Sequence, residues 1–330
     1  MYDILTLNAI SPKGLANLPK DEFNVSSDIE NPDGIIVRSA DMHDYVIPDS
    51  LLCIARAGAG TNNIPTDKCA EKGVVVFNTP GANANAVKEL VIAALLVSSR
   101  KLTEAAQWTK TLKGQPDMDK LVEGGKKKFA GPEITGKTLG VIGLGAIGVL
   151  VANSALSLGM EVVGYDPFLS VKSAWHISGQ VKLAGSIEEV VAQSDYVTIH
   201  VPQNDKTKNM VNKELLNVFK KGSRLINLAR GGLVDPAAVA EALDNGTLSK
   251  YVTDFAADEL LDKENVITFP HLGASTPESE ENCAVMAALE LKEYIKYGNI
   301  KNSVNFPNCE APFTGKARVT IAHQNIPNMV

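Results

Sequence analysis

Short apolar runs alternate with helical stretches along almost the whole chain. The runs have the length of buried strands and most are rich in Val and Ile; they are Tyr2–Leu7, Gly34–Val37, Cys53–Ala57, Val74–Phe77, Thr138–Ile142, Glu161–Tyr165, Tyr196–His200, Arg224–Leu228, Tyr251–Phe255 and Val266–Phe269. The helical stretches between them include Asn85–Arg100, Ala146–Leu158, Ile187–Gln193 and Pro236–Asn245. Because strand, helix and strand repeat in this order, we expect an α/β protein with doubly wound parallel sheets.

The expected strands fall into two sets, which predicts two domains. One set lies before about residue 80 and the other between about 138 and 270, with long helices expected at 85–113 and 277–297. We therefore expect residues 1–98 and 278–310 to form a discontinuous first domain, and residues 99–277 to form a second domain inserted into it. The tail, 311–330, contains a strand-like run at 317–321 and predicts the start of a further unit.

Composition places the chain among ordinary globular proteins. Its 330 residues are 45% hydrophobic and 21% charged, and its longest apolar run, near Leu90–Val97, is far shorter than a membrane span. A net charge of −6 and an aromatic content of 5% predict no binding to nucleic acid or to a membrane surface. The four cysteines are scattered without zinc or redox spacing. We expect reduced cysteines, no metal site and a cytoplasmic location.

One glycine-rich segment has the spacing of a dinucleotide-binding turn. Gly143, Gly145 and Gly148 follow an apolar strand and open a helix, and Asp166 ends the next strand, close to the expected distance of about 20 residues. The glycines permit a tight turn, a close approach of backbone to pyrophosphate, and close packing of helix on sheet. Asp166 would bind ribose hydroxyls and repel a 2′-phosphate. We therefore expect a Rossmann-like domain that binds NAD rather than NADP.

Four polar residues follow or interrupt the later strands, at the edge where parallel sheets bind ligands: Arg230, Asp254, Glu259 and His271. Histidine suits a base that accepts a hydroxyl proton while hydride leaves the same carbon. A carboxylate such as Glu259 would orient that imidazole, and Arg230 would bind a substrate carboxylate. Singly, each is as easily a surface or capping residue. Together they predict oxidation of a small 2-hydroxy acid.

These motifs in order resemble the D-isomer-specific 2-hydroxyacid dehydrogenase family. The resemblance runs from about Ile35 to Phe306 and is carried by Arg56–Asn63, Asn78–Gly81, Gly143–Gly148, His200–Pro202, Asn227–Gly231 and Pro270–Thr276. It implies a first domain that binds the substrate, a second that binds NAD, and a homodimer or tetramer built through the sheet domain. Within the family, the chain is most similar to members that act on 3-phosphoglycerate.

The resemblance also assigns individual residues. It implies that Arg230, Glu259 and His271 are the catalytic set and that Asp254 meets the nicotinamide carboxamide. Besides the three glycines and Asp166, the cofactor site is expected to include Ala146, Ile147, His200, Val201, Pro202, Thr207, Leu228, Ala229, Arg230, His271, Gly273 and Ala274.

Some positions depart from the family pattern. Ala146 stands where an arginine is common, so one pyrophosphate contact is expected to be absent. Leu260 replaces a frequent proline after Glu259, and the link from Glu259 to His271 is shorter than usual. The sequence therefore does not predict the geometry of that loop. The tail, with His323–Pro327, resembles the start of a regulatory ACT-type domain that is cut off, so serine feedback is expected to be absent or altered.

A phosphorylated substrate needs more than one cation in its pocket. Arg38 and Arg56 follow strands of the first domain, and Lys126 begins a lysine triplet on the interdomain loop. We hypothesise that these three residues hold the phosphate of 3-phosphoglycerate, which would be oxidised to 3-phosphohydroxypyruvate at the start of serine biosynthesis. The other expected substrate contacts are Ala57, Gly58 and Asn78.

Two alternatives stay open. One is a related dehydrogenase acting on glycerate, hydroxypyruvate, lactate or a branched hydroxy acid, which would gain nothing from the extra cations. The other is an NAD-sensing binding protein similar to corepressors of the same fold, which would bind partner peptides through its first domain. The acidic net charge and the lack of a nuclear-type basic cluster argue against the second alternative.

Overall fold

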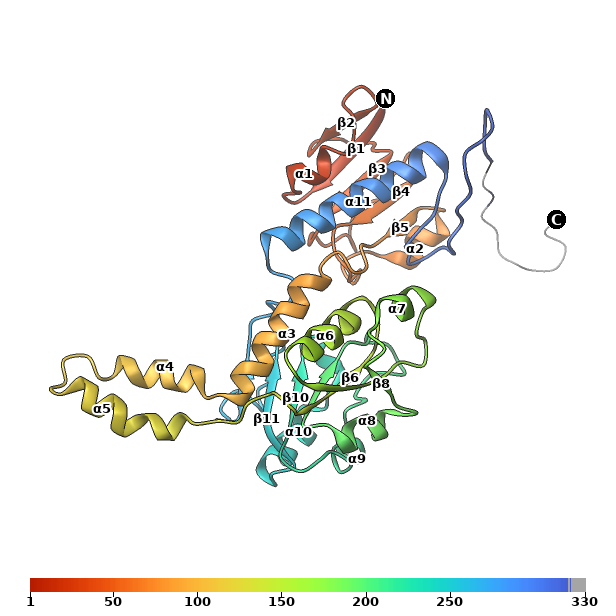
Figure 1. Cartoon of the computed structure of the whole chain (residues 1–330). Helices are drawn as coiled ribbons and strands as arrows, with labels where there is room; N and C mark the ends of the chain where they lie inside the picture. Colours follow the sequence, from red (N-terminus) through yellow and green to blue (C-terminus); the bar gives the residue numbers. More distant parts are fainter. Residues whose placement is uncertain (320, 322–330) are drawn as a thin grey trace. The chain divides into compact units, whose positions relative to one another are not determined.

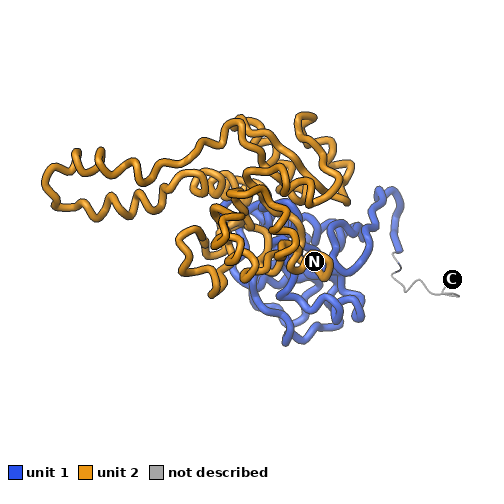
Figure 2. The backbone as a smooth tube through the Cα atoms, turned by 90° about the horizontal axis from the view of Figure 1, so that it is seen from below, with its two compact units in different colours: residues 1–83, 276–330 blue, residues 84–275 orange. Residues whose placement is uncertain are grey.

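The computed structural model describes residues 1–319 and 321 and divides into two compact units. The first unit comprises Met1–Asn83 and the chain from Thr276 onward, and the second comprises Ala84–Ser275 (Figure 2). No helix among the described residues has the length and apolar character needed to cross a bilayer.

The first unit contains a parallel sheet with helices on both faces. Its elements are β1 (Tyr2–Leu7), α1 (Pro12–Leu15), β2 (Phe23–Ser26), β3 (Gly34–Val37), β4 (Cys53–Arg56), α2 (Thr66–Glu71), β5 (Val75–Phe77) and α11 (Pro277–Tyr297). The strand order, β2-β1-β3-β4-β5, is that of flavodoxin-like folds. Ile36 packs in the core with α11, and Ile35 and Val37 pack in the core with α2. All of β3 is therefore buried, as expected of a strand covered on both faces.

The second unit contains a larger parallel sheet in the order β12-β11-β10-β9-β6-β7-β8 (Figure 1). Its strands are β6 (Thr138–Ile142), β7 (Glu161–Tyr165), β8 (Lys182–Leu183), β9 (Tyr196–Ile199), β10 (Ser223–Asn227), β11 (Leu248–Thr253) and β12 (Val266–Thr268). The helices and the turn on its faces are α3 (Ala84–Ser99), α6 (Ala146–Ser157), α7 (Val171–His176), α8 (Ile187–Gln193), α9 (Lys213–Leu216), η2 (Gly231–Leu233) and α10 (Pro236–Asp244). The chain moves outward from β6 to β8, then returns to β9 on the other side of β6. This is the dinucleotide-binding order with one further strand, and it confirms the predicted doubly wound fold.

Helix α3 lies within the second unit. Its Val91 and Leu95 are fully buried in one core with strands β6 and β10. The chain therefore leaves the first unit after Asn83 and re-enters it at Thr276, whereas the sequence placed these joints at 98/99 and 277/278. The apolar period of α3 predicts a helix, but it does not indicate which of two sheets that helix covers.

An arm extends from the body of the second unit where one helix to residue 113 was expected (Figures 1 and 2). It consists of α4 (Leu102–Lys110), α5 (Met118–Gly125) and the 3-10 turn η1 (Lys126–Phe129). The Trp108 and Phe129 rings pack 5.2 Å apart within the arm. At its base, the buried Lys250 ammonium of β11 donates to a Glu104 carboxylate oxygen at 2.8 Å. This ion pair fastens the arm to the sheet.

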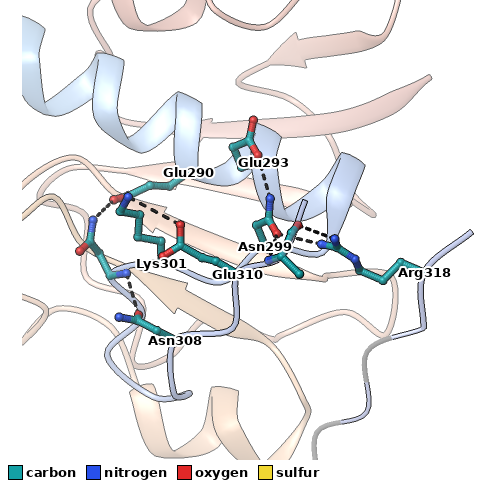
Figure 3. A network of polar contacts seen from close by, with 9 residues as sticks. Glu290, Glu293, Asn299, Lys301, Asn308, Glu310 and Arg318 are labelled. Carbon is teal, nitrogen blue, oxygen red and sulfur yellow. Dashed lines mark hydrogen bonds and ion pairs between the residues drawn. The ribbon is translucent and has the colours of Figure 1, made fainter. Parts of the chain in front are cut away.

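After α11 the chain folds back along the first unit. Arg318 donates to the Tyr297 carbonyl at 2.5 Å and to the Asn299 side chain at 2.8 Å (Figure 3). Residues 317–319 are not in a strand, so the strand expected at 317–321 is wrong for the residues described. The reason is that Arg318 ties this stretch to the end of α11 and not to a sheet. Residues 320 and 322–330, including His323–Pro327, lie outside the described residues.

A buried acid on α11 belongs to the same polar network (Figure 3). Glu290 is 8% exposed; its Oε1 accepts the Asn302 side-chain N–H at 2.6 Å, while no donor among the described residues reaches Oε2. Burial raises the pKa of Glu290 to about 7, against the lowering effects of the Asn302 hydrogen bond and the Lys301 charge. The Asn302 carbonyl also accepts the backbone N–H of Asn78 at 3.3 Å.

We predict that Glu290→Gln stabilises the protein at alkaline pH. Between the ordinary carboxyl value of 4.5 and about 7, the folded chain binds the proton more tightly than the unfolded chain. Wild-type stability therefore falls as pH rises through this range, and the loss is complete above it. Urea denaturation should find the variant about 1–3 kcal/mol more stable at pH 8 and close to wild type at pH 4.5.

The matched control is Glu293→Gln, which removes an exposed carboxylate one turn further along α11. This control should show no such pH-dependent difference. A Glu290→Gln effect of the same size at both pH values would contradict the titration account.

Candidate active site

The turn after β6 has the geometry that a pyrophosphate site requires. Gly143 has φ +93°, and a Cβ there would lie 2.6 Å from the His200 carbonyl oxygen. A Cβ on Gly148 would lie 1.9 Å from the Gly143 carbonyl oxygen, so the helix can approach the turn only with glycine there. A Cβ on Gly145, which caps α6, would meet nothing within 4 Å. The N-terminus of α6 is thus open to an anion. Ala146 and Ile147 form its first turn, and Ala146 offers no charge of its own.

Asp166 stands beside this turn, immediately after β7. Its carboxylate accepts the backbone N–H of Leu144 at 2.9 Å and that of Phe168 at 2.8 Å. These two bonds tie the glycine turn to the chain after β7 and hold the carboxylate in place. Each oxygen keeps a further lone pair for a ribose hydroxyl. The residues present therefore fit a dinucleotide.

The loop after β9 forms the other side of the switch point. The His200 N–H donates to the Ile142 carbonyl at 2.7 Å, and His200 Nε2 lies 3.0 Å from the Thr198 hydroxyl oxygen. Desolvation lowers the pKa of His200 to about 3, so its ring is neutral at physiological pH. Thr207 donates to the Pro202 carbonyl at 2.7 Å and so shapes the loop. The side chain of Val201 faces the first glycine of the turn.

A buried asparagine, to which the sequence motif Asn227–Gly231 assigned no role, shapes the loop after β10. Asn227 donates to the Arg230 carbonyl at 2.9 Å and accepts the Ala229 N–H at 3.2 Å. Leu228 anchors the loop in the core. The Arg230 side chain is exposed; one guanidinium nitrogen donates to the Ala229 carbonyl at 2.7 Å. Its other N–H groups remain available to an anionic ligand.

Asp254, at the end of β11, is buried and binds the backbone of the His271 loop. Its carboxylate accepts the N–H of Leu272 at 3.0 Å and that of Gly273 at 2.7 Å. The Asp254 carbonyl accepts the His271 N–H at 3.2 Å. His271 itself is exposed and has φ +56°, a left-handed conformation that costs a non-glycine residue about 1–3 kcal/mol. Both carboxylate oxygens of Asp254 therefore hold this loop, in which Ala274 is the next residue.

Glu259 is not hydrogen-bonded to His271 in this structure. It lies in an exposed turn, and no hydrogen bond or ion pair joins the two side chains, both of which are described. The neighbouring Leu260 is 2% exposed and packs in the core, and its N–H closes the turn onto the Ala257 carbonyl at 2.9 Å. Burial of Leu260 therefore leaves Glu259 on the surface. The expected pairing of Glu259 with His271 stays a prediction.

The expected substrate residues of the first unit surround one loop after β4. A Cβ on Gly58, whose φ is +152°, would lie 1.7 Å from a guanidinium nitrogen of Arg56, so this glycine leaves room for the Arg56 side chain. The Asn78 side chain donates to the Ala59 carbonyl at 2.6 Å and fixes the far side of the loop. Ala57 is buried, and its N–H donates to β3.

Two of the expected phosphate ligands already have acidic partners. Arg38 forms an ion pair with Glu280 of α11 at 2.5 Å. Lys126 begins η1 and forms an ion pair with Glu123 in the preceding turn. The arm that carries Lys126 projects from the body of its unit, apart from the carboxyl ends of the strands (Figure 1). No group of His, Cys, Asp and Glu within residues 1–319 and 321 is arranged to hold a metal ion.

Comparison with known proteins agrees with this geometry. Residues 92–273 match the model of the D-isomer specific 2-hydroxyacid dehydrogenase NAD-binding domain. A D-3-phosphoglycerate dehydrogenase of Methanocaldococcus jannaschii is 35% identical over 299 residues, which make up 88% of this chain and 55% of that protein. The chain spans about half the length of the curated relatives it matches.

Solved structures share the architecture. The NAD⁺-bound 3-phosphoglycerate dehydrogenase of Entamoeba histolytica has a TM-score of 0.71 and 25% identity, covering 92% of this chain and 99% of that one. The apo D-mandelate dehydrogenase of Rhodotorula graminis has a TM-score of 0.75 and 24% identity, covering 89% and 94%, and supports the fold alone. NAD is accordingly the cofactor of the second unit. The chain belongs to the D-isomer specific 2-hydroxyacid dehydrogenase family.

Proposed function

We propose that the protein oxidises 3-phospho-D-glycerate to 3-phosphohydroxypyruvate, using NAD. One observation carries the hydride chemistry: the exposed Arg230 and His271 follow β10 and β12, which lie on either side of β11 in the sheet whose glycine turn we expect to bind NAD. Ligands of such sheets bind beyond the carboxyl ends of the strands, where both residues lie. The name shared by the relatives at 33–36% identity supports the choice of substrate.

In the proposed reaction His271 accepts the proton of the substrate C2 hydroxyl. Arg230 binds the substrate carboxylate and stabilises negative charge on the C2 oxygen as the C–H bond breaks. Bound NAD⁺ supplies the acceptor for the hydride, which leaves C2 with its electron pair while the C=O bond forms. Glu259 would stabilise the imidazolium if its loop brought it to His271. Asp166, the glycine turn, the loop at 200–207 and the loop before Ala274 would hold the cofactor.

The structure also provides an argument for a second candidate, a dehydrogenase of unphosphorylated hydroxy acids such as glycerate. Arg38 is paired with Glu280, and Lys126 is paired with Glu123 on the arm. The Arg56 side chain lies against Gly58 in the loop after β4, and Arg38 follows the neighbouring strand β3. The two candidates therefore differ in what Arg56 contributes.

We predict a preference for the phosphorylated acid that depends on Arg56. Initial rates of NADH oxidation should give a kcat/KM for 3-phosphohydroxypyruvate about a hundredfold above that for hydroxypyruvate, or about 2.7 kcal/mol. Arg56→Ala should remove most of this ratio, because it removes a cation next to the substrate loop. Lys126→Ala removes an equal charge on the arm and should leave the ratio unchanged.

The outcomes separate the candidates. Equal rates on both acids would retain the dehydrogenase and reject the phosphate site. Loss of the preference in Lys126→Ala instead of Arg56→Ala would indicate that the substrate phosphate binds at the arm. Absence of turnover on 3-phosphohydroxypyruvate, on hydroxypyruvate and on pyruvate, tested as a third substrate, would reject the enzyme and favour an NAD-sensing binding protein.

We further propose that the protein is a homodimer joined through the arm. Helix α4 has no buried residue, and the arm exposes the apolar side chains of Leu102, Met118 and Leu121. The ion pair of Lys250 with Glu104 holds the base of the arm against the sheet. A fixed, apolar projection can associate with the same surface of a second copy around a twofold axis.

Light scattering should therefore find that Leu121→Glu halves the mass of the particle. A charge introduced into a buried apolar contact is strongly unfavourable, whereas Leu121 in a monomer is already 40% exposed. Val218→Glu, at a residue 41% exposed elsewhere on the same unit, is the matched control and should leave the mass unchanged. An unchanged mass in Leu121→Glu would place the contact elsewhere.

A further inference from the structure

The side chain of Phe255 lies between the two loops that carry the proposed reactive residues. Phe255 follows Asp254 at the end of β11, and its N–H donates to the Thr253 hydroxyl at 3.1 Å. Its ring centroid is 5.1 Å from that of the His271 imidazole, edge to face at 60°. On the other loop, a Cβ built on Gly231 would lie 3.2 Å from the Phe255 Cβ. Gly231 directly follows Arg230.

The backbone and the side chain of His271 are held by different groups. Asp254 accepts the N–H groups of His271, Leu272 and Gly273, so the path of this loop is set by hydrogen bonds. The imidazole takes part in no hydrogen bond or ion pair among the described residues. The aromatic contact to Phe255 is therefore what restricts the rotation of the ring.

Phe255 is not an ordinary core residue. It is only partly buried, and it belongs to none of the four apolar cores that the described residues form. Its neighbours include Gly231 of one loop and the His271 ring of the other. A phenyl ring in this position contributes little to the cores and lies between the two loops.

We propose that Phe255 is a positioning residue, which holds the His271 imidazole in its working orientation relative to Arg230. The inference rests on the proposed function, in which His271 accepts the substrate proton. Proton transfer requires the base within hydrogen-bond reach of the hydroxyl, and a misplacement of about 1 Å can cost about a hundredfold in rate. Phe255 touches neither substrate nor proton in this scheme and acts through the imidazole.

The kinetic test compares Phe255→Leu with Phe255→Tyr. Phe255→Leu should lower kcat by about ten- to a hundredfold while KM for the hydroxy acid changes by less than about threefold. Phe255→Tyr keeps the ring and should retain kcat within about threefold. Phe219→Leu, which removes a buried ring from another part of the same unit, is the control for a general loss of packing. Wild-type kcat in Phe255→Leu would overturn the proposal.

A double-mutant cycle tests whether Phe255 acts through His271. In a His271→Ala background, Phe255→Leu should have almost no further effect on kcat, because the imidazole that it positions is absent. Equal fold losses in both backgrounds would indicate a merely structural role and overturn the proposal.

A spectroscopic measurement separates this inference from the proposed function, because it needs no turnover. The protein has five histidines, so the His271 ring protons can be assigned by their loss in His271→Ala. The edge-to-face ring should give these protons a ring-current shift that disappears in Phe255→Leu and survives in Phe255→Tyr. If the shift behaves so but no 2-hydroxy acid is turned over, the contact stands and the proposed function fails. If Phe255→Leu leaves the His271 protons unmoved, the positioning role fails whatever the activity.

Discussion

The parallel pairing of β6 with β9 is the contact on which the candidate site depends. In this pairing Ile142 lies opposite Ile199, and the His200 N–H donates to the Ile142 carbonyl at 2.7 Å. From β6 the chain runs toward β7 on one side, and from β9 it runs toward β10 on the other. The loops that follow the two strands therefore diverge, and the space between them is where a dinucleotide fits. Gly143 is needed because this pairing brings the His200 carbonyl against the turn.

At the carboxyl ends of these strands, buried and exposed polar groups have different roles. Asn227 and Asp254 are buried, and their side chains make hydrogen bonds to the backbone of the loops after β10 and β12. Arg230 and His271, which those loops carry, are exposed. A buried polar group is costly unless it is bonded, so it fixes the backbone firmly. An exposed group keeps donors and acceptors for a ligand. Phe255 lies between the loop that carries Arg230 and the loop that carries His271.

Sequence patterns predicted the strands of both sheets except β2 and β8, which each lie at an edge. β1, β3, β6 and β7 begin and end where the apolar runs do, because their inner residues are buried and therefore apolar. The edge strands β2 and β8 were not expected. Both residues of β8 are exposed, and β2 has a single buried residue. These strands exist because a neighbouring strand offers hydrogen-bonding partners, which leaves no apolar pattern to detect.

The amino-acid sequence by itself determined the doubly wound class, the glycine turn with its acid, and the identity of the polar residues at the strand ends. Each of these depends on local chemistry: apolar period, glycine conformation, and the position of a residue directly after a strand. The tertiary structure alone decided that α3 covers the second sheet, that Lys126 lies on an arm, and that Arg38 pairs with Glu280. It also decided that Leu260 is buried and that Glu259 beside it is exposed. These outcomes depend on which distant surfaces meet, and the packing of the whole unit sets that.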